Sequence, residues 1–367
     1  MENSINKGQN LDLGNRCSKI AFTRAKTTFS NRQNQDGEVL LNENASFCNI
    51  VGFGKTRIGI CSDGIGTKIE VAERCGIYDS LGFDLTAMVV DDLIANGVEP
   101  TSITNILDVD RLSEPVVDEL MKGLAKAAEK ARVSVTGGEI AELGQRIGGY
   151  GSNMHFNWCA TAIGKLPEGR NLIDGCRIRE NDAVIALYNR GLRSNGYSLA
   201  RRILFDTFGD SWHNQSFDLN DCKTTWGQVL LFPSVIYAAV VNDLLNQNQN
   251  IHGIAHITGG GLPDNLGRLL RVQALGAELN DLFEPEKFFL ELQKLGRITD
   301  HQAYHSWNMN HGMLLIVPPD SVEEVIGFMN GTEITTRKIG RITGLPGIRI
   351  HSRGLQKEIL QFDGKGK

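Results

Sequence analysis

Two periodicities alternate along the first half of the chain. Alternating or continuous apolar runs predict strands, and apolar positions three and four residues apart predict helices. The predicted strands are residues 56–61, 102–109, 133–138 and 155–164, and the predicted helices are residues 84–96 and the segment that follows Ser113. Asp84 is the predicted N-cap and Gly97 the stop of the first helix, while Ser113 and Pro115 fit the start of the second. Strands that alternate with helices indicate an α/β unit.

The second half repeats this alternation. Its predicted strands are residues 182–188, 252–257, 312–318 and 335–342, and its predicted helices are residues 196–208, 234–247 and 321–330. The turn-rich segment 165–175 separates the halves. We therefore expect a polar N-terminal arm or lid over 1–50, a first domain over 51–168, a second α/β domain over 175–350, and a tail over 351–367.

Composition narrows the class of protein. The 367 residues are 41% hydrophobic and 22% charged, which is typical of a soluble globular protein. A net charge of -5 without a basic run argues against nucleic acid or an anionic membrane as the main partner. The N-terminus is polar, and no apolar run approaches the length of a membrane span. Seven scattered cysteines without a C-x-x-C pair indicate reduced thiols and a cytoplasmic location.

The loop SDGIGTK, residues 62–68, follows the first predicted strand. It combines Asp63, Gly64, Gly66, Thr67 and Lys68. Its order does not match a Walker A loop, and a carboxylate repels a bare phosphate. A magnesium ion between Asp63 and the phosphates would reconcile these features. An ordinary Asp-Gly turn is about equally compatible with the loop.

Asp92 occupies an unusual position in the predicted helix 84–96. It shares the apolar face with Leu85 and Met88, where a carboxylate is costly unless it is paired or bound to a metal. A metal shared with Asp63 is the favoured interpretation, and a buried salt bridge with Lys68 is the alternative. Asp91 lies about 100° away on the helix and is expected to face solvent or the rim of the site.

Four further stretches carry glycines, carboxylates or amides beside predicted strands. They are TGGEIAE (136–142), RSNGYS (193–198), AHITGGGLPDN (255–265) and WNMNHGM (307–313). Glycines between a strand and a helix suit an anion cradle, although each stretch alone also fits an ordinary turn. Carboxylates, glycine turns and amides without a nucleophilic triad suit phosphoryl transfer by positioning and a metal ion.

Taken together, these motifs resemble the aminoimidazole ribonucleotide synthetase (phosphoribosylformylglycinamidine cyclo-ligase) family. SDGIGTK, FDLTAMVVDDLIANGVEP, TGGEIAE, RSNGYSL, AHITGGGLPDNL and WNMNHGM occur in the family's order. The resemblance covers residues from about 56 to about 345. It implies an ATP-dependent enzyme of purine synthesis. It also implies a homodimer formed through the N-terminal sheet, with ATP near the interface and a second α/β domain across a cleft.

The resemblance also assigns roles to positions in this sequence. Asp63 and Asp92 would bind Mg²⁺, and a requirement for K⁺ stays open. Lys68, Asp92 and Glu139 would be catalytic. The implied ATP-binding residues are Asp63, Gly64, Gly66, Thr67, Lys68, Asp84, Gly137, Gly138 and Glu139. The implied substrate-binding residues are Arg193, Ser194, Asn195, Thr258, Gly259, Gly260, Gly261, Asn308 and His311.

Some positions depart from the family pattern. Arg193 replaces a usual His, and Asp91 replaces a usual Asn. A glycine-rich lid is reduced to GFG at 52–54, and LGQRIGGYG (143–151) replaces a methionine-proline stretch. Two alternatives therefore stand beside the cyclo-ligase: a related ATP-dependent enzyme that phosphorylates another small molecule, and a nucleotide-binding regulator without catalysis.

Overall fold

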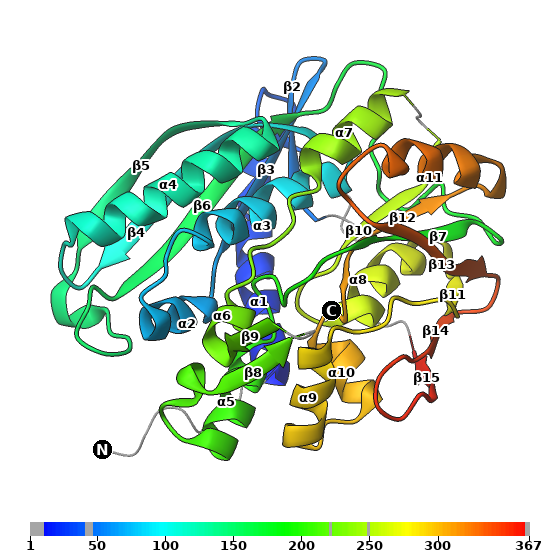
Figure 1. Cartoon of the computed structure of the whole chain (residues 1–367). Helices are drawn as coiled ribbons and strands as arrows, with labels where there is room; N and C mark the ends of the chain where they lie inside the picture. Colours follow the sequence, from blue (N-terminus) through cyan, green and yellow to red (C-terminus); the bar gives the residue numbers. More distant parts are fainter. Residues whose placement is uncertain (1–10, 41–46, 220–221, 248–249, 364–367) are drawn as a thin grey trace.

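A computed structural model describes residues 11–40, 47–219, 222–247 and 250–363. The first half of the chain forms a six-stranded sheet in the order β1-β2-β3-β6-β4-β5 (Figure 1). Only the pair β4–β5 is parallel. The strands are β1 Glu38–Val39, β2 Asn49–Phe53, β3 Thr56–Gly64, β4 Glu99–Val109, β5 Ser134–Glu142 and β6 Phe156–Lys165.

The second half forms a seven-stranded sheet in the order β10-β12-β7-β13-β11-β14-β15. Its strands are β7 Ala183–Tyr188, β10 Gly253–His256, β11 Gly276–Leu279, β12 His311–Val317, β13 Thr336–Thr343, β14 Gly347–His351 and β15 Ile359–Phe362. Strand β12 is buried at every position, as its continuous apolar sequence predicts. The mixed α/β architecture expected from the sequence is confirmed in both halves.

Helix α3 (Leu81–Ala95) lies between the two sheets. It packs on β3, β4 and β6 of the first sheet and on β10 of the second (Figure 1). All of its residues except Phe83 and Asp92 are buried. A helix covered on all sides has no solvent face, so each of its carboxylates needs a partner.

Helix α4 (Glu114–Ala131) packs beside α3 on the same side of the first sheet. The two helices meet at glycines. A Cβ atom added to Gly82 would lie 2.2 Å from the carbonyl carbon of Gly123. A Cβ atom added to Gly123 would lie 1.9 Å from the Asp79 carbonyl oxygen, so neither position admits a side chain.

The opposite face of the first sheet carries exposed apolar side chains. On this face, Ile106 of β4 is 52% exposed and Ile163 of β6 is 41% exposed. The inward-facing neighbours Ile103 and Leu107 are buried. An exposed apolar sheet face of this kind is typical of an interaction surface.

The remaining helices connect and cover the strands. They are α1 Leu11–Lys26, α2 Lys68–Cys75, α5 Tyr197–Phe208, α6 Trp226–Leu230, α7 Ala238–Gln247, α8 Gly261–Leu270, α9 Lys287–Gly296, α10 Asp300–Ser306 and α11 Val322–Asn330. A short hairpin of β8 (Ser216–Leu219) and β9 (Cys222–Thr225) precedes α6. Within the described ranges, no helix has the length and apolar character needed to cross a membrane.

Several boundaries differ from the sequence-based expectations. Helix α1 and the short strand β1 lie in the segment expected to be an arm without periodic structure, and β15 lies in the expected tail. Helix α7 begins at Ala238, four residues later than predicted. The Asp91 carboxylate accepts hydrogen bonds from the amides of Tyr237 and Ala238, at 2.9 and 3.0 Å. This bond pair fixes the start of α7, because it satisfies amides of the first turn.

Candidate functional site

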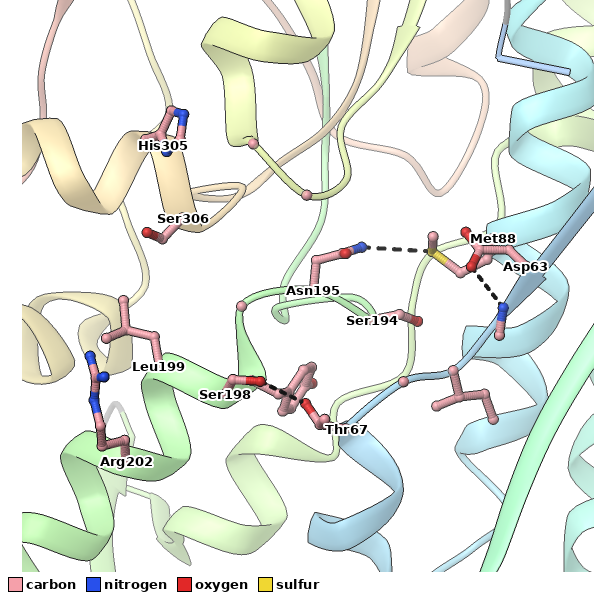
Figure 2. Close-up of a pocket in the computed structure, with 17 residues that line it drawn as sticks. Asp63, Thr67, Met88, Ser194, Asn195, Ser198, Leu199, Arg202, His305 and Ser306 are labelled. Atoms are coloured by element: carbon pink, nitrogen blue, oxygen red, sulfur yellow. Dashed lines mark hydrogen bonds between the residues drawn. The ribbon is translucent and has the colours of Figure 1, made fainter. Parts of the chain in front are cut away.

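A cavity of about 470 Å³ brings together three of the sequence motifs (Figure 2). Loop residues after β3, the turn before α5 and the turn before α8 form most of its wall. Its lining residues are Asp63, Gly64, Ile65, Gly66, Thr67, Met88, Ser194, Asn195, Gly196, Tyr197, Ser198, Leu199, Arg202, Gly259, Gly260, His305 and Ser306. Motifs that lie far apart in sequence, at 62–68, 193–198 and 255–265, therefore converge on one concave surface.

Two helices begin at this cavity. The N-caps of α5 and α8 are Gly196 and Gly260, whose φ angles of 82° and 93° require a residue without a side chain. Asn265 holds the turn before α8, because its amide nitrogen lies 2.8 Å from the Gly261 carbonyl oxygen. The unpaired N–H groups of helix N-termini favour anions, so the cavity suits a phosphorylated ligand.

Asp63 and Asp92 form a pair of neighbouring carboxylates beside the cavity. Burial raises the pKa of Asp63; a hydrogen bond from the Gly64 amide at 2.7 Å opposes the shift, and the nearby charge of Asp92 adds to it. Asp92 follows the cavity residue Met88 by one helical turn and keeps 16% of its side-chain surface accessible. The pair therefore carries negative charge that a cation would neutralise.

The carboxylates of Asp63 and Asp92 are suitable ligands for magnesium, but they do not complete its coordination shell. In the part of the chain that the structure describes, no group of three His, Cys, Asp or Glu side chains could hold a metal ion. Mg²⁺ commonly binds one or two carboxylates and takes its other ligands from water and substrate phosphates. Asp63 and Asp92 fit that arrangement.

Lys68 and Asp84 do not reach the cavity. Their charged groups lie 2.6 Å apart with no exposed side-chain surface, and the Lys68 ammonium also donates to the Phe232 carbonyl at 2.7 Å. Burial lowers the pKa of Lys68 and raises that of Asp84. The prediction that Asp84 caps α3 is wrong, since Ser80 occupies that position. The pair instead joins α2, α3 and the segment before α7 through Ser234.

Arg193 is buried as well and is 1% exposed. It forms an ion pair with Asp91 at 2.8 Å, and it donates to the Val235 carbonyl at 2.9 Å. The expectation that Asp91 faces solvent or a site rim is wrong, because the turn before α5 and the start of α7 cover that side of α3. The neighbouring Ser194 and Asn195 do line the cavity.

Gly137, Gly138 and Glu139 lie within β5, which continues to Glu142, so the prediction that the strand ends at the two glycines before a turn is wrong. Gly138 lets β5 approach β4 closely, since a Cβ atom there would lie 2.5 Å from the Asn105 carbonyl oxygen. Gly138 and Glu139 line a separate hollow of about 370 Å³ on the open face of the first sheet, together with Ser62 of β3. Consecutive residues of β3, Ser62 and Asp63, thus face two different hollows.

The remaining candidates support the scaffold around the cavity. The Asn308 amide donates to the Gly191 carbonyl at 2.9 Å, and His311 Nε2 accepts from the Phe283 amide at 3.2 Å. Burial lowers the pKa of His311 to about 4. Thr258 hydrogen-bonds Asn265, and Gly261 is the first residue of α8. The structure therefore places Gly259 and Gly260 at the cavity, but not Thr258, Gly261, Asn308 or His311.

Sequence reasoning missed two basic side chains. Arg202 of α5 and His305 of α10 line the cavity on the side opposite Asp63 (Figure 2). Arg202 lies one helical turn after Ser198, on the cavity-facing side of a predicted helix, so helical spacing from the RSNGYS motif could have identified it. His305 had no such signal, because α10 was not predicted.

Comparison with known proteins identifies relatives over nearly the whole chain. The family "AIR synthase related protein" matches through its N-terminal domain at residues 44–165 and its C-terminal domain at residues 179–353. The phosphoribosylformylglycinamidine cyclo-ligase of Thermococcus gammatolerans is 34% identical over 93% of this chain and 95% of its own length. The protein of that name from Methanothermobacter thermautotrophicus is 35% identical over 81% of this chain and 83% of its own.

Solved structures share the fold at low sequence identity. The HypE–HypF complex includes a chain with a TM-score of 0.61 and 15% identity, covering 92% of this chain and 98% of that one. Thiamine-monophosphate kinase from Stenotrophomonas maltophilia has a TM-score of 0.57 and 17% identity, with coverage of 90% and 94%. PurL of T. maritima complexed with FGAR has a TM-score of 0.59 and 14% identity, covering 89% of this chain and 48% of that one.

Proposed function

The chain belongs to the AIR synthase related protein family, and on that premise we propose that it is an ATP-dependent phosphoribosylformylglycinamidine cyclo-ligase. It converts formylglycinamidine ribonucleotide into aminoimidazole ribonucleotide in purine synthesis, with release of ADP and phosphate. Relatives that bear this name align with nearly the full length of the chain. The convergence of three family motifs on one cavity carries the proposal, because a single small molecule bound there would contact all three.

The reaction needs an oxygen converted into a leaving group. The substrate's amide oxygen attacks the γ-phosphorus of ATP, and ADP leaves. A neighbouring nitrogen of the substrate then attacks the carbon that bears the phosphorylated oxygen. The bond between this carbon and the oxygen breaks, phosphate departs with the oxygen, and loss of a proton from the nitrogen completes the ring. The cavity contributes by holding the attacking nitrogen near that carbon and by excluding water.

The substrate is placed in the cavity between α5, α8 and α10. Its phosphate suits the side that carries Arg202 and the N-terminus of α8, where N–H groups and a guanidinium favour an anion. Ser194 and Asn195 are placed closer to Asp63, as Figure 2 shows, and suit the reacting end of the substrate.

ATP is placed on the open face of the first sheet, beside Ser62, Gly138 and Glu139. Its terminal phosphate would then approach Asp63 at the end of β3. Asp63 and Asp92 would hold Mg²⁺, which would neutralise charge that develops on the transferred phosphoryl group. HypE with ATP and ThiL complexed with AMPPCP are solved structures of this fold that bind nucleotides.

The active form is a cytoplasmic homodimer that pairs through the first sheet. The exposed side chains of Ile106 and Ile163 support this assembly, because dimerisation would remove them from water. Residues 51–168 form the nucleotide-binding and dimerising domain, and residues 175–350 form the second domain. A K⁺ ion at the nucleotide site would be an addition to Mg²⁺.

Purified protein incubated with ATP, Mg²⁺ and formylglycinamidine ribonucleotide tests the proposal. Formation of aminoimidazole ribonucleotide, followed by mass spectrometry, together with stoichiometric ADP, is the expected result. Phosphate release only with a different small molecule would indicate another ATP-dependent member of the family. Nucleotide binding without turnover of any substrate would indicate a regulator.

A further inference from the structure

A row of four polar side chains runs from the side of the cavity into the interior. Asp92 Oδ1 lies 2.7 Å from His256 Nδ1, and His256 Nε2 lies 2.8 Å from Arg193 Nη2. The same Arg193 nitrogen lies 2.8 Å from Asp91 Oδ2. His256 has no exposed surface, so water does not compete for either ring nitrogen.

This contact pattern determines which ring nitrogen carries the proton. A guanidinium has only N–H donors, so His256 Nε2 must accept. The proton of the neutral ring then lies on Nδ1, and Nδ1 donates to Asp92. The Asp92 carboxylate can only accept, so it requires the same tautomer, and Arg193 supports the hydrogen bond that Asp92 receives although it does not touch Asp92 itself.

Asp91 holds Arg193 in place. Its second oxygen accepts from the amides of Tyr237 and Ala238, and Arg193 also donates to the Val235 carbonyl. The backbone of Arg193 has a φ angle of 63°, in the left-handed region, which directs its side chain inward from the turn before α5. The guanidinium is thus fixed from several directions before any ligand binds.

We propose that Arg193 and His256 are positioning residues that orient the Asp92 carboxylate for binding a divalent cation, with Asp91 as the counter-ion that fixes Arg193. The inference rests on the proposed function through the metal site at Asp63 and Asp92. It replaces the expected role of Arg193 in substrate binding. Removal of a hydrogen-bond partner behind a metal ligand typically lowers metal affinity by about 10- to 100-fold.

Two substitutions of His256 separate its two contacts. In His256→Asn, the side-chain amide nitrogen takes the place of Nδ1 and can still donate to Asp92. In His256→Gln, the side-chain oxygen takes the place of Nε2 and can accept from Arg193, but the imidazole donor to Asp92 is lost. Asp92 then keeps only the weaker thiol donor Cys61, whose Sγ lies 3.4 Å from Oδ2. The readout is Mn²⁺ affinity in the presence of ADP, followed by electron paramagnetic resonance on the full chain.

We expect His256→Gln to weaken Mn²⁺ binding by roughly tenfold or more, and His256→Asn to recover most of that loss. His252→Gln is the matched control, because His252 Nδ1 lies 2.8 Å from the Asp182 carboxylate in a buried contact that does not involve Asp92. It should destabilise the fold without changing Mn²⁺ affinity.

A second measurement does not depend on a variant that folds. Nitrogen-15 spectra of the wild-type protein should show the His256 proton on Nδ1. A wild-type proton on Nε2, or unchanged Mn²⁺ affinity in His256→Gln, would overturn the inference while leaving the cyclo-ligase proposal intact. A wild-type chain that binds no Mn²⁺ with ADP and turns over no ATP would overturn both.

Discussion

Arg193 and Asp91 form a fully buried ion pair, with Nη2 and Oδ2 2.8 Å apart and exposed side-chain fractions of 1% and 0%. In the family that the sequence motifs resemble, His is usual at the position of Arg193 and Asn at the position of Asp91. The two departures from that pattern are therefore one exchange, in which the added positive and negative charges neutralise each other. A buried pair of this kind requires both partners, because either charge alone would be desolvated without compensation.

The first prediction concerns this pair. Arg193→His and Asp91→Asn should each lower the free energy of unfolding, by up to about 3–5 kcal/mol where a charge is left unpaired. The double variant should lose less than the sum of the two, since it removes both charges. Urea unfolding of all four proteins measures the coupling. Additive losses would show that the two residues are energetically independent.

The second prediction concerns the carboxylates at the cavity. Asp63→Asn and Asp92→Asn should each reduce Mg²⁺-dependent ATP turnover by at least about tenfold, because each removes a charge on which the cation depends. Turnover is measured by ADP release at low Mg²⁺ concentration. Asp118→Asn is the control, since Asp118 is exposed on α4 and pairs only with Lys122 among the ion pairs of the described chain. Near-normal turnover in both cavity variants would contradict the metal assignment.

The third prediction concerns His311 and acid. Burial lowers the pKa of this side chain to about 4, below the unfolded value of about 6.5. The unfolded chain therefore binds more protons between these values, and His311 contributes stability above pH 6.5 that is lost as the pH falls toward 4. The loss is about 3 kcal/mol.

Urea midpoints at several pH values measure this dependence. In His311→Gln, the side-chain oxygen can still accept from the Phe283 amide, but no imidazole titrates. The variant should therefore show a flatter decline of unfolding free energy between pH 6.5 and 4. An identical slope in both proteins would assign the acid sensitivity to other groups.

The fourth prediction concerns assembly. The wild-type protein should scatter light as a dimer at micromolar concentration, with an interface above about 2,000 Å². Ile163→Lys should produce monomers with weaker ATP binding, because it places a charge in the proposed interface. Ile163 is chosen because Ile106 also lines the hollow proposed for ATP. Leu345→Lys changes an equally apolar residue that is 81% exposed in the second domain, and it should leave the dimer intact. A wild-type monomer that turns over ATP normally would disprove the assembly.

The alternation of strands and helices and the chemistry of the loops were readable from sequence alone, although elements such as α9, α10 and β11 were not predicted. The continuous apolar run of β12 identifies it as a buried strand. Gly196 and Gly260 mark the starts of α5 and α8, because the turn before each helix has a positive φ angle at its N-cap. The motifs around Asp63, Ser194 and Gly260 also indicated an anion site, because strand-to-helix turns direct backbone N–H groups toward a ligand. These features depend on residues that are close in sequence.

Only the tertiary structure decided which charges meet. The amphipathic argument placed Asp91 toward solvent, but α3 is enclosed by two sheets, so its carboxylates face Lys68, Arg193 and His256 from distant segments. The glycines of TGGEIAE continue an edge strand instead of turning, because pairing with β4 supplies hydrogen bonds that local propensity does not register. Sequence periodicity identifies which face of a single helix or strand is apolar. Which charged side chains pair with each other depends on how separate elements pack in three dimensions.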